Sequence, residues 1–347
     1  MNKMDKSKVL MTALKGRTLV VLLILIIFFG IKSPAFLQAN SVITVMKHVA
    51  LYGILGVGMT YVIIIGGIDL SVGSIVGLVG MIAGGLIVEG LPLEVFGVVA
   101  YFNVPLIVIF SLLLGAFIGF VNGIIITKFN VAPFIATLGM MYICRGFAML
   151  RTNGATYQDL KGKEAYGNTG FNVIGKSIGT IPTVIIVFVI IAAAAMLALK
   201  YTPFGWHVLA VGGNAKASRL SGIRTNKIIT TVYVFSGICA AIVGLITTAQ
   251  LTAANPSSGD GWEMNAISSV VLGGTSMSGG IGSIGGTIIG AFVIGVINDG
   301  MVMIGVSEFW QRVIKGIIII LAVIIDQFQA RLSAKMALRQ AANETLK

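Results

Sequence analysis

The sequence predicts an all-α polytopic membrane protein with about ten transmembrane helices and both termini in the cytoplasm. Hydrophobic residues make up 56% of the 347 residues and charged residues only 10%, whereas soluble globular chains carry about 25% charged residues. Several uncharged stretches reach the roughly 20 residues that a helix needs to cross the hydrocarbon core. These stretches show no period-two alternation, which argues against an outer-membrane β-barrel.

The distribution of positive charge sets the expected topology. The formal net charge is +12, and Lys and Arg gather in segments 1–17, 200–227 and 328–347. Positive residues in short loops mark the cytoplasmic side of a membrane protein, so we expect these three segments inside, as an N-terminal segment, a connecting loop and a tail. Orientation and contact with membrane lipid account for this charge, and we expect no nucleic-acid partner.

Ten spans satisfy this topology and form one transmembrane domain over residues 18–327. Six crossings bring the chain back inside at Lys200, after an outward loop at 151–180, and four more return the tail to the inside. The expected spans are 18–36, 49–68, 70–89, 105–127, 131–150, 181–199, 228–250, 262–279, 281–304 and 309–327. Four glycines in or beside the eighth span could break it into a half-helix, which is tolerated at membrane depth only where protein or a water-filled cavity covers the backbone.

Glycine indicates close packing of the helices. It occurs 45 times, mostly in apolar segments, and Gly282, Gly286 and Gly290 recur at every fourth position. Small residues at this spacing let helix backbones approach closely. We therefore expect a tight multi-helix bundle, in which glycines could also line a flexible pathway.

Asp69 is the most conspicuous polar residue between apolar runs. It lies in the string GGIDLSVGS, residues 66–74. Intramembrane carboxylates are costly and often functional, but the expected topology puts Asp69 near the inner ends of two spans. An acid there can cap the third helix at its N-terminus, and we favour this capping role over a substrate or ion role.

Further polar residues lie within or beside apolar segments. Interhelical hydrogen bonds explain most such residues, and a pathway lining is the alternative. The candidate pathway-lining residues are Asp69, Asn122, Asn265 and Asn298. Lys47 and His48 form a polar pair at the outer end of the second span, where they either anchor the helix at the interface or sense pH, since histidine changes charge near neutral pH.

The sequence predicts no metal site and no cofactor bound by this chain. Cys144 and Cys239 each fall in an apolar segment, where a buried thiol acts as a small hydrophobe. The two histidines, His48 and His207, have no metal-ligand spacing to a cysteine or to each other.

One stretch matches a nucleotide-binding pattern by letters alone. Gly170, Gly175, Lys176 and Ser177 satisfy the phosphate-loop spacing. That motif needs a preceding buried strand and a following helix N-terminus to hold phosphate, and here it falls in the expected outward loop. We therefore predict that the chain does not hydrolyse ATP itself.

The segment 204–223 predicts a docking surface on the cytoplasmic side. It carries His207, Lys216 and Arg219 and no acid, and it lies between two long apolar segments. Asn214 is a helix start signal and Gly222 a helix stop signal. A short basic helix on a cytoplasmic loop is a candidate contact for a partner protein.

Four strings together resemble one known family, the bacterial monosaccharide importer permeases of the ribose and galactose type. The resemblance covers most of the chain, from Val49 to Asp326, and is closest to the ribose permeases. The strings are GGIDLSVGSIVGL at 66–78, FNVAPFIATLGMMYICRG at 129–146, the segment 204–223, and AISSVVLGGTSMSGGIGSIGGTIIGA at 266–291.

The resemblance implies the permease subunit of an ATP-binding-cassette importer in the bacterial inner membrane. It implies an ATPase subunit that uses ATP, a periplasmic or extracellular sugar-binding protein, and a second permease copy, with a homodimer favoured over a heterodimer. Segment 214–223 would be the coupling helix that touches the ATPase. The implied coupling residues are Gly213, Asn214, Ala217, Arg219, Leu220, Ser221 and Gly222.

Three other classes compete with this interpretation. An ion-coupled secondary transporter would use buried carboxylates, for which Asp69 and Asp299 are the candidates, and neither has an evident intramembrane partner in the sequence. An integral-membrane enzyme would need a cluster of catalytic groups, and neither histidine lies near one. A channel would not need a docking element at 214–222.

Overall fold

The computed structural model describes residues 3–321, 323 and 324 of the chain. The expected tail at 328–347 and the last residues of the expected tenth span lie outside the described residues. Side-chain environments are described from residue 18 onward.

The described chain is a bundle of helices joined by turns, longer loops and two small hairpins. The long helices are α1 (Lys3–Lys32), α2 (Ala39–Ile64), α3 (Val72–Val88), α4 (Val104–Lys128), α5 (Pro133–Leu150), α6 (Thr183–Tyr201), α9 (Thr225–Leu251) and α11 (Ile284–Met303). The shorter helices are α7 (Pro203–Gly213), α8 (Ala215–Leu220) and α10 (Trp262–Leu272). A further helical segment covers residues 308–321.

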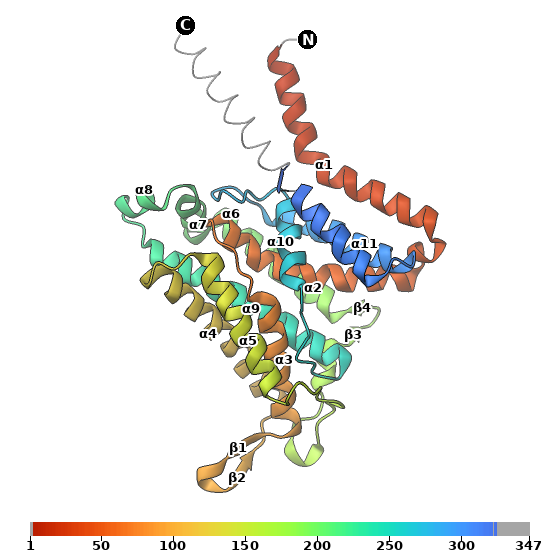
Figure 1. Ribbon diagram of the computed structural model, residues 1–347, viewed down its shortest axis with the longest axis vertical. Coiled ribbons are helices and arrows are strands. Elements are labelled where there is room, and N and C mark those ends of the chain that lie inside the picture. Colours follow the sequence, from red (N-terminus) through yellow and green to blue (C-terminus); the bar gives the residue numbers. More distant parts are fainter. Residues whose placement is uncertain (1–2, 322, 325–347) are drawn as a thin grey trace.

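The connections contain 3-10 turns and two antiparallel pairs of strands. The 3-10 turns are η1 (Pro34–Leu37), η2 (Glu94–Phe96), η3 (Glu164–Tyr166) and η4 (Phe171–Gly175). The strands β1 (Leu91–Leu93) and β2 (Val98–Ala100) form one hairpin, and β3 (Ser177–Ile178) and β4 (Ile181–Pro182) form the other. In Figure 1 the first turns of α1 and the α7–α8 segment lie near one end of the bundle, and the β1–β2 hairpin projects from the opposite end.

Six helices in the described part of the chain are long and apolar enough to cross a membrane: α2, α4, α5, α6, α9 and α11. Two shorter apolar helices, Thr18–Lys32 within α1 and Val72–Val88, add to them. The all-α membrane class is therefore confirmed, whereas the count of ten spans and the placement of the termini remain predictions. The second span begins earlier than expected, because α2 starts at Ala39 and not at residue 49.

The expected eighth span, 262–279, is wrong as a continuous helix. Helix α10 has 11 residues, which is about 16 Å at 1.5 Å per residue against a hydrocarbon core of about 30 Å. It ends at Leu272, and Gly274, Gly279 and Gly280 have φ of +85°, +83° and +75°. These left-handed angles are incompatible with helix continuation and easy only for glycine, so the half-helix is the form that the sequence adopts.

Glycine brings the helices into backbone contact. A Cβ on Gly286 of α11 would overlap the carbonyl of Gly273, and one on Gly290 would overlap the carbonyl of Ser269, both at the end of α10. The predicted close approach is therefore confirmed for these two glycines, while Gly282 lies before α11 and faces Ile64. Gly115, Gly119 and Gly123 of α4 make the same kind of contact with the backbone of α9.

The core surrounds α2 and α3, which are buried along most of their length. Helices α4, α5 and α6 expose large apolar side chains along one face, among them Phe117, Ile143 and Ile190. An apolar face of this kind suits contact with lipid or with another apolar protein surface.

Candidate functional site

A buried polar cluster forms where α2 passes into α3. Asp69 is fully buried, and its carboxylate accepts hydrogen bonds from the Ser71 amide at 3.0 Å, the Ser71 hydroxyl at 2.6 Å and the Ser236 hydroxyl at 2.8 Å. The Asn122 side-chain amide donates to the Ser71 hydroxyl at 3.0 Å. The cluster thus joins the α2–α3 connection to α4 and α9.

Asp69 is not the N-cap of α3, although we expected a capping role. Ser71 occupies the N-cap position, and its side chain makes no capping hydrogen bond. Asp69 stands two residues earlier and accepts the amide of Ser71 itself. Asp69 therefore orients the residues that lead into α3 and, through Ser236, connects them to α9 by a hydrogen bond. This structural role is related to capping.

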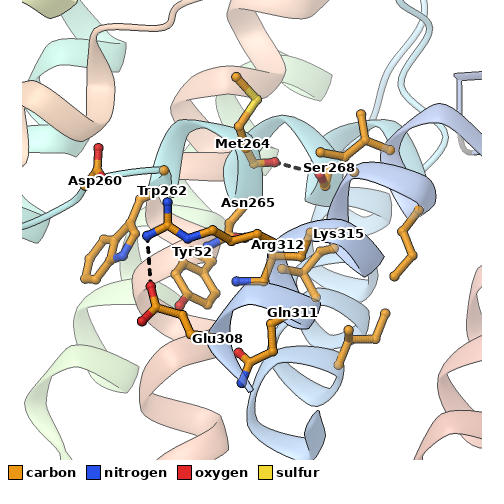
Figure 2. Close-up of a pocket in the computed structure, with 16 residues that line it drawn as sticks. Tyr52, Asp260, Trp262, Met264, Asn265, Ser268, Glu308, Gln311, Arg312 and Lys315 are labelled. Carbon is orange, nitrogen blue, oxygen red and sulfur yellow. Dashed lines mark hydrogen bonds and ion pairs between the residues drawn. The ribbon is translucent and has the colours of Figure 1, made fainter. Parts of the chain in front are cut away.

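A cavity of about 410 Å³ opens beside α10, within the roughly 300–1,000 Å³ range of ligand pockets. Its walls come from α2, α10, α11 and the helical segment 308–321 (Figure 2). The polar or aromatic residues that line it are Tyr52, Asp260, Trp262, Asn265, Ser268, Glu308, Gln311, Arg312 and Lys315.

The cavity lining combines an aromatic pair with polar groups. The rings of Tyr52 and Trp262 meet edge to face with centroids 5.6 Å apart. Arg312 and Glu308 neutralise each other through an ion pair of 2.8 Å, drawn as a dashed line in Figure 2. Asn265 projects from α10 at the same site. A ligand with hydroxyl groups and apolar C–H faces suits this lining, because each kind of group finds a partner.

The four candidate pathway-lining residues separate into two places. Asn265 lines the cavity, and Asn298 follows Ile297, another lining residue, on α11. Asn298 is buried, and neither atom of its amide has a hydrogen-bond partner in the described part of the chain. Asp69 and Asn122 lie instead in the buried cluster and do not line the cavity.

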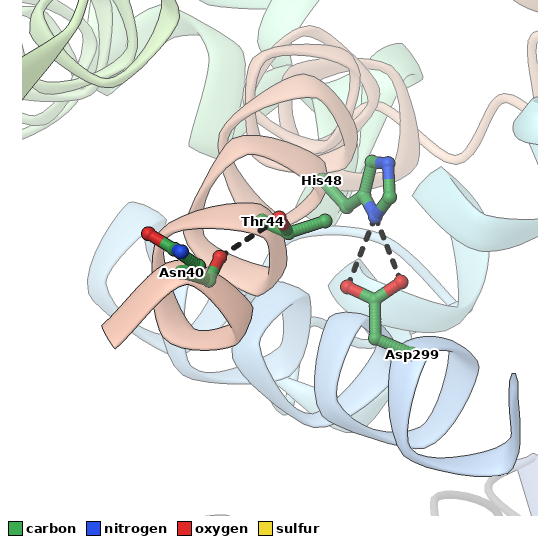
Figure 3. Close-up of polar contacts among 4 residues, drawn as sticks. All are labelled: Asn40, Thr44, His48 and Asp299. Atoms are coloured by element: carbon green, nitrogen blue, oxygen red, sulfur yellow. Dashed lines mark hydrogen bonds and ion pairs between the residues drawn. The ribbon is translucent and has the colours of Figure 1, made fainter. Parts of the chain in front are cut away.

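Asp299 has a partner on another helix that the sequence did not reveal. The Nδ1 atom of His48 lies 2.8 Å and 2.9 Å from the two carboxylate oxygens of Asp299, as Figure 3 shows. His48 also stacks on Tyr52 with ring centroids 6.4 Å apart. The pair ties α2 to α11 next to the aromatic wall of the cavity.

The expected docking segment forms two helices in place of one. Helix α7 begins after Thr202, whose side chain accepts the amide of Gly205, with Pro203 at its first position. Helix α8 begins after Asn214, whose side-chain oxygen accepts the Ala217 amide at 2.9 Å. A threonine followed by proline is itself a helix start signal, so the sequence did contain the sign of α7.

Helix α8 presents an exposed surface of mixed character. It ends at Leu220, and Gly222 has φ of +86°, in agreement with the predicted start and stop signals. Leu220 is 90% exposed, and Ala215, Lys216, Arg219 and Leu220 line a hollow on this surface. Arg219 reaches the Asn226 side chain at 3.1 Å, so α8 is tied to the start of α9.

The phosphate-loop letters do not form a phosphate loop. Residues 171–175 are the 3-10 turn η4, and Ser177 begins β3. The strand, loop and helix N-terminus that a phosphate site needs are replaced by a turn followed by a strand. Among the described residues, no three His, Cys, Asp or Glu side chains gather in a metal-binding arrangement.

Sequence reasoning missed several residues of these sites. Ser71 lies only two positions after Asp69, but nothing in that string marks it as a partner. Ser236 carries no distinguishing pattern, because its partner Asp69 comes from another part of the chain. Tyr52 and Trp262 are aromatic residues near the ends of apolar runs, a position typical of interfacial anchors. Only the packing of α2 against α10 brings their rings together.

Residues 41–323 match the protein family described as branched-chain amino acid transport system / permease component. The chain belongs to this family. The match covers the bundle from the start of α2 to the helical segment after α11, so it includes the cavity, the buried cluster and helices α7 and α8.

Curated relatives resemble the chain over nearly its whole length. The ribose import permease protein RbsC of Escherichia coli (strain K12) is 40% identical over 315 residues, which cover 90% of this chain and 94% of the relative. RbsC of Bacillus subtilis (strain 168) is 40% identical over 308 residues, covering 88% and 90%. The xylose transport system permease protein XylH of E. coli (strain K12) is 32% identical over 368 residues, covering 90% and 91%. No solved structure matches the chain.

Proposed function

We propose that this chain is the membrane-spanning permease subunit of an ATP-binding-cassette importer that carries a ribose-like monosaccharide across the bacterial inner membrane. The 40% identity to ribose import permeases over about nine-tenths of the chain carries the proposal. On this proposal the subunit catalyses no reaction, and a partner ATPase binds and hydrolyses ATP.

The chemistry of the cavity supports a neutral sugar as cargo. Tyr52 and Trp262 offer aromatic faces to the C–H side of a sugar ring, and the Asn265 amide can donate to and accept from its hydroxyl groups. The charges of Arg312 and Glu308 are satisfied within the wall. We propose Asn265 and the neighbouring Asn298 as pathway-lining residues, and we propose a structural role for Asp69 and Asn122, which lie in the buried cluster.

The partners follow from the two ends of the bundle. We propose that α8 docks on the ATPase through its exposed leucine and basic residues, and that the coupling residues from Gly213 to Gly222 form this contact. The opposite end, with the β1–β2 hairpin, would receive the sugar-binding protein. A second permease copy, identical in the simplest case, would complete the pathway in the membrane.

Two alternatives remain distinct from this proposal. The family description names branched-chain amino acids, whose ammonium and carboxylate groups could face the charged side chains of Asp260 and Lys315 in the same wall. An ion-coupled transporter would use the His48–Asp299 pair as its ion-binding site. Similarity to the ribose and xylose permeases favours the sugar importer over both.

The test is uptake by the purified complex of this chain with its ATPase and binding protein in proteoliposomes. We expect ATP-dependent uptake of labelled ribose, reduced about tenfold by Asn265→Ala or Trp262→Ala through loss of roughly 1.4 kcal/mol of sugar contact. Asn40→Ala and Trp310→Ala are matched controls, because both side chains are exposed and lie outside the cavity. Uptake of leucine without uptake of ribose or xylose would contradict the proposal. Uptake driven by a proton gradient without ATP would also contradict it.

A further inference from the structure

Three segments meet backbone to backbone at the C-terminal end of α2. The first is the end of α2 at its last residue, Ile64. The second is the end of α7 at Gly212, and the third is the loop 273–283 at Gly279 and Gly280. We call these four residues the glycine joint. The Gly280 amide donates to the Ile64 carbonyl at 2.8 Å. A Cβ on Gly212 would overlap that same carbonyl oxygen and lie 2.7 Å from the Gly280 nitrogen.

The contact completes the hydrogen bonding of the α2 terminus. The last carbonyls of a helix have no partner within the helix. Here the carbonyls of Tyr61, Val62 and Ile63 are taken by the amides of the following turn, at residues 65–67. The Ile64 carbonyl receives its donor from Gly280, more than two hundred residues later. Loop 273–283 therefore acts as the cap of α2.

No larger residue fits at the joint. Gly279 and Gly280 have φ of +83° and +75°, which only glycine adopts at little cost. A Cβ on Gly279 would lie 2.8 Å from the Gly212 carbonyl oxygen, and one on Gly280 would lie 2.9 Å from the Gly213 Cα. The three segments are in direct backbone contact, with no side chains between them that could change rotamer. A displacement of one segment therefore has to displace the others.

Hydrogen bonds connect the glycine joint to α10, which forms part of the cavity wall. Loop 273–283 is held to α10 by the Thr275 amide on the Val270 carbonyl at 3.2 Å and is closed on itself by the Ser276 amide on the Ile281 carbonyl at 3.0 Å. The end of α10 is further locked to α11 by the Gly273–Gly286 contact. Helix α10 carries Trp262, Asn265 and Ser268 on the cavity.

We propose that the glycine joint transmits the displacement of α7 and α8 to α10, so that Gly212 is a positioning residue that couples the docking surface to the cavity. This inference rests on the proposed function, because it needs a partner that moves α8. Gly212 and Gly213 are adjacent but have different surroundings. Gly212 faces the joint, whereas a Cβ on Gly213 would meet no atom within 4 Å and points to the surface.

The test separates transmission from docking and from folding. In the complete complex, Gly212→Ala should keep the ATPase subunits bound and hydrolysis within about twofold of the wild type, while ribose uptake falls about tenfold. The ratio of ribose imported to ATP hydrolysed is the decisive quantity, because a loss of folded protein lowers both quantities together.

Two further variants calibrate this result. Gly282→Ala disturbs the same region more gently, because its Cβ would meet only side-chain carbons of Ile64 and Thr275, at 2.7 Å and 2.8 Å. We expect a loss of uptake of about threefold in that variant. Gly285→Ala is the matched control, since its Cβ would have only an ordinary contact with Met196 at 3.9 Å, and it should behave as the wild type.

The outcomes are distinguishable. Wild-type uptake and hydrolysis in Gly212→Ala and Gly282→Ala would overturn the proposal, and so would loss of the ATPase subunits from both variants, which would make the joint part of the docking surface. Failure of both variants to assemble in the membrane would make it a folding element only. Absence of ATP-driven ribose uptake in the wild-type complex would instead contradict the proposed function.

Discussion

His48 of α2 and Asp299 of α11 form a direct pair, with the histidine Nδ1 atom 2.8 Å from one carboxylate oxygen and 2.9 Å from the other. The histidine side chain is 40% exposed and the aspartate 11%. The pair sits on the edge of the aromatic wall, because His48 stacks on Tyr52. It gives the only donor that the described residues provide to the Asp299 carboxylate.

We expect His48→Gln to retain uptake and His48→Ala to lower stability. The glutamine amide can donate to Asp299, whereas alanine leaves a nearly buried carboxylate without its donor, at a cost of about 1–3 kcal/mol. Thermal unfolding in detergent measures the difference, and Asn40→Ala on the same helix is a control. A shift of the pH profile of uptake in His48→Gln would show that titration of His48 matters, in contrast to an anchoring role.

Asp69 should be a structural residue that tolerates an isostere. Asp69→Asn can still accept from the Ser71 amide and donate to a serine hydroxyl, so we expect a cost of about 1 kcal/mol and normal uptake. Asp69→Ala strands the Ser71 amide and the hydroxyl groups of Ser71 and Ser236, and should cost about 1–3 kcal/mol. Expression and uptake are measured together. Loss of uptake in a well-expressed Asp69→Asn protein would instead assign it to the transport pathway.

The docking role of α8 is best tested at Leu220, whose side chain is 90% exposed. Leu220→Asp should release the ATPase subunits, because it puts a negative charge in the centre of an apolar and basic contact at a cost of about 2 kcal/mol or more. Copurification of the ATPase is the measurement. Val95→Asp is a matched control, since Val95 is 93% exposed on the turn between β1 and β2.

Charge reversal at Arg219 makes a complementary variant. Arg219→Glu should also uncouple hydrolysis from uptake, but it removes the hydrogen bond to Asn226 as well, so Leu220→Asp gives the cleaner test. If both complexes keep their ATPase subunits and normal uptake, then α8 is not the coupling helix.

Lys176 should have no role in nucleotide binding. Because Lys176 is an exposed residue between η4 and β3, Lys176→Ala should leave the ATPase rate of the complex and the uptake of ribose within about twofold of the wild type. Hydrolysis assays on the purified complex check this. A selective loss of ATP binding in the variant would show that residues 170–177 hold phosphate after all.

The sequence predicted the bounds of helix α8 almost to the residue, for a local reason. Helix caps depend on side chains within a few positions of the helix end. Asn214 and Gly222 therefore predicted where α8 begins and ends without information about the rest of the fold. The break in the eighth span was visible in the same way, since glycines that favour left-handed backbone angles mark it. What the sequence could not decide was whether the break would occur, because a helix through glycine is only about 1 kcal/mol per residue less favourable than through alanine.

By itself the sequence determined the membrane class, the regions of positive charge and the positions where helices can begin and end, since composition, short-range capping and apolar run length are properties of neighbouring residues. The tertiary structure alone decided that Asp69 meets Ser236, that His48 meets Asp299 and that Gly212 meets Ile64 and Gly280. Each of these contacts joins residues more than sixty positions apart. Their formation depends on how glycine surfaces let whole helices approach, and no local pattern encodes that packing.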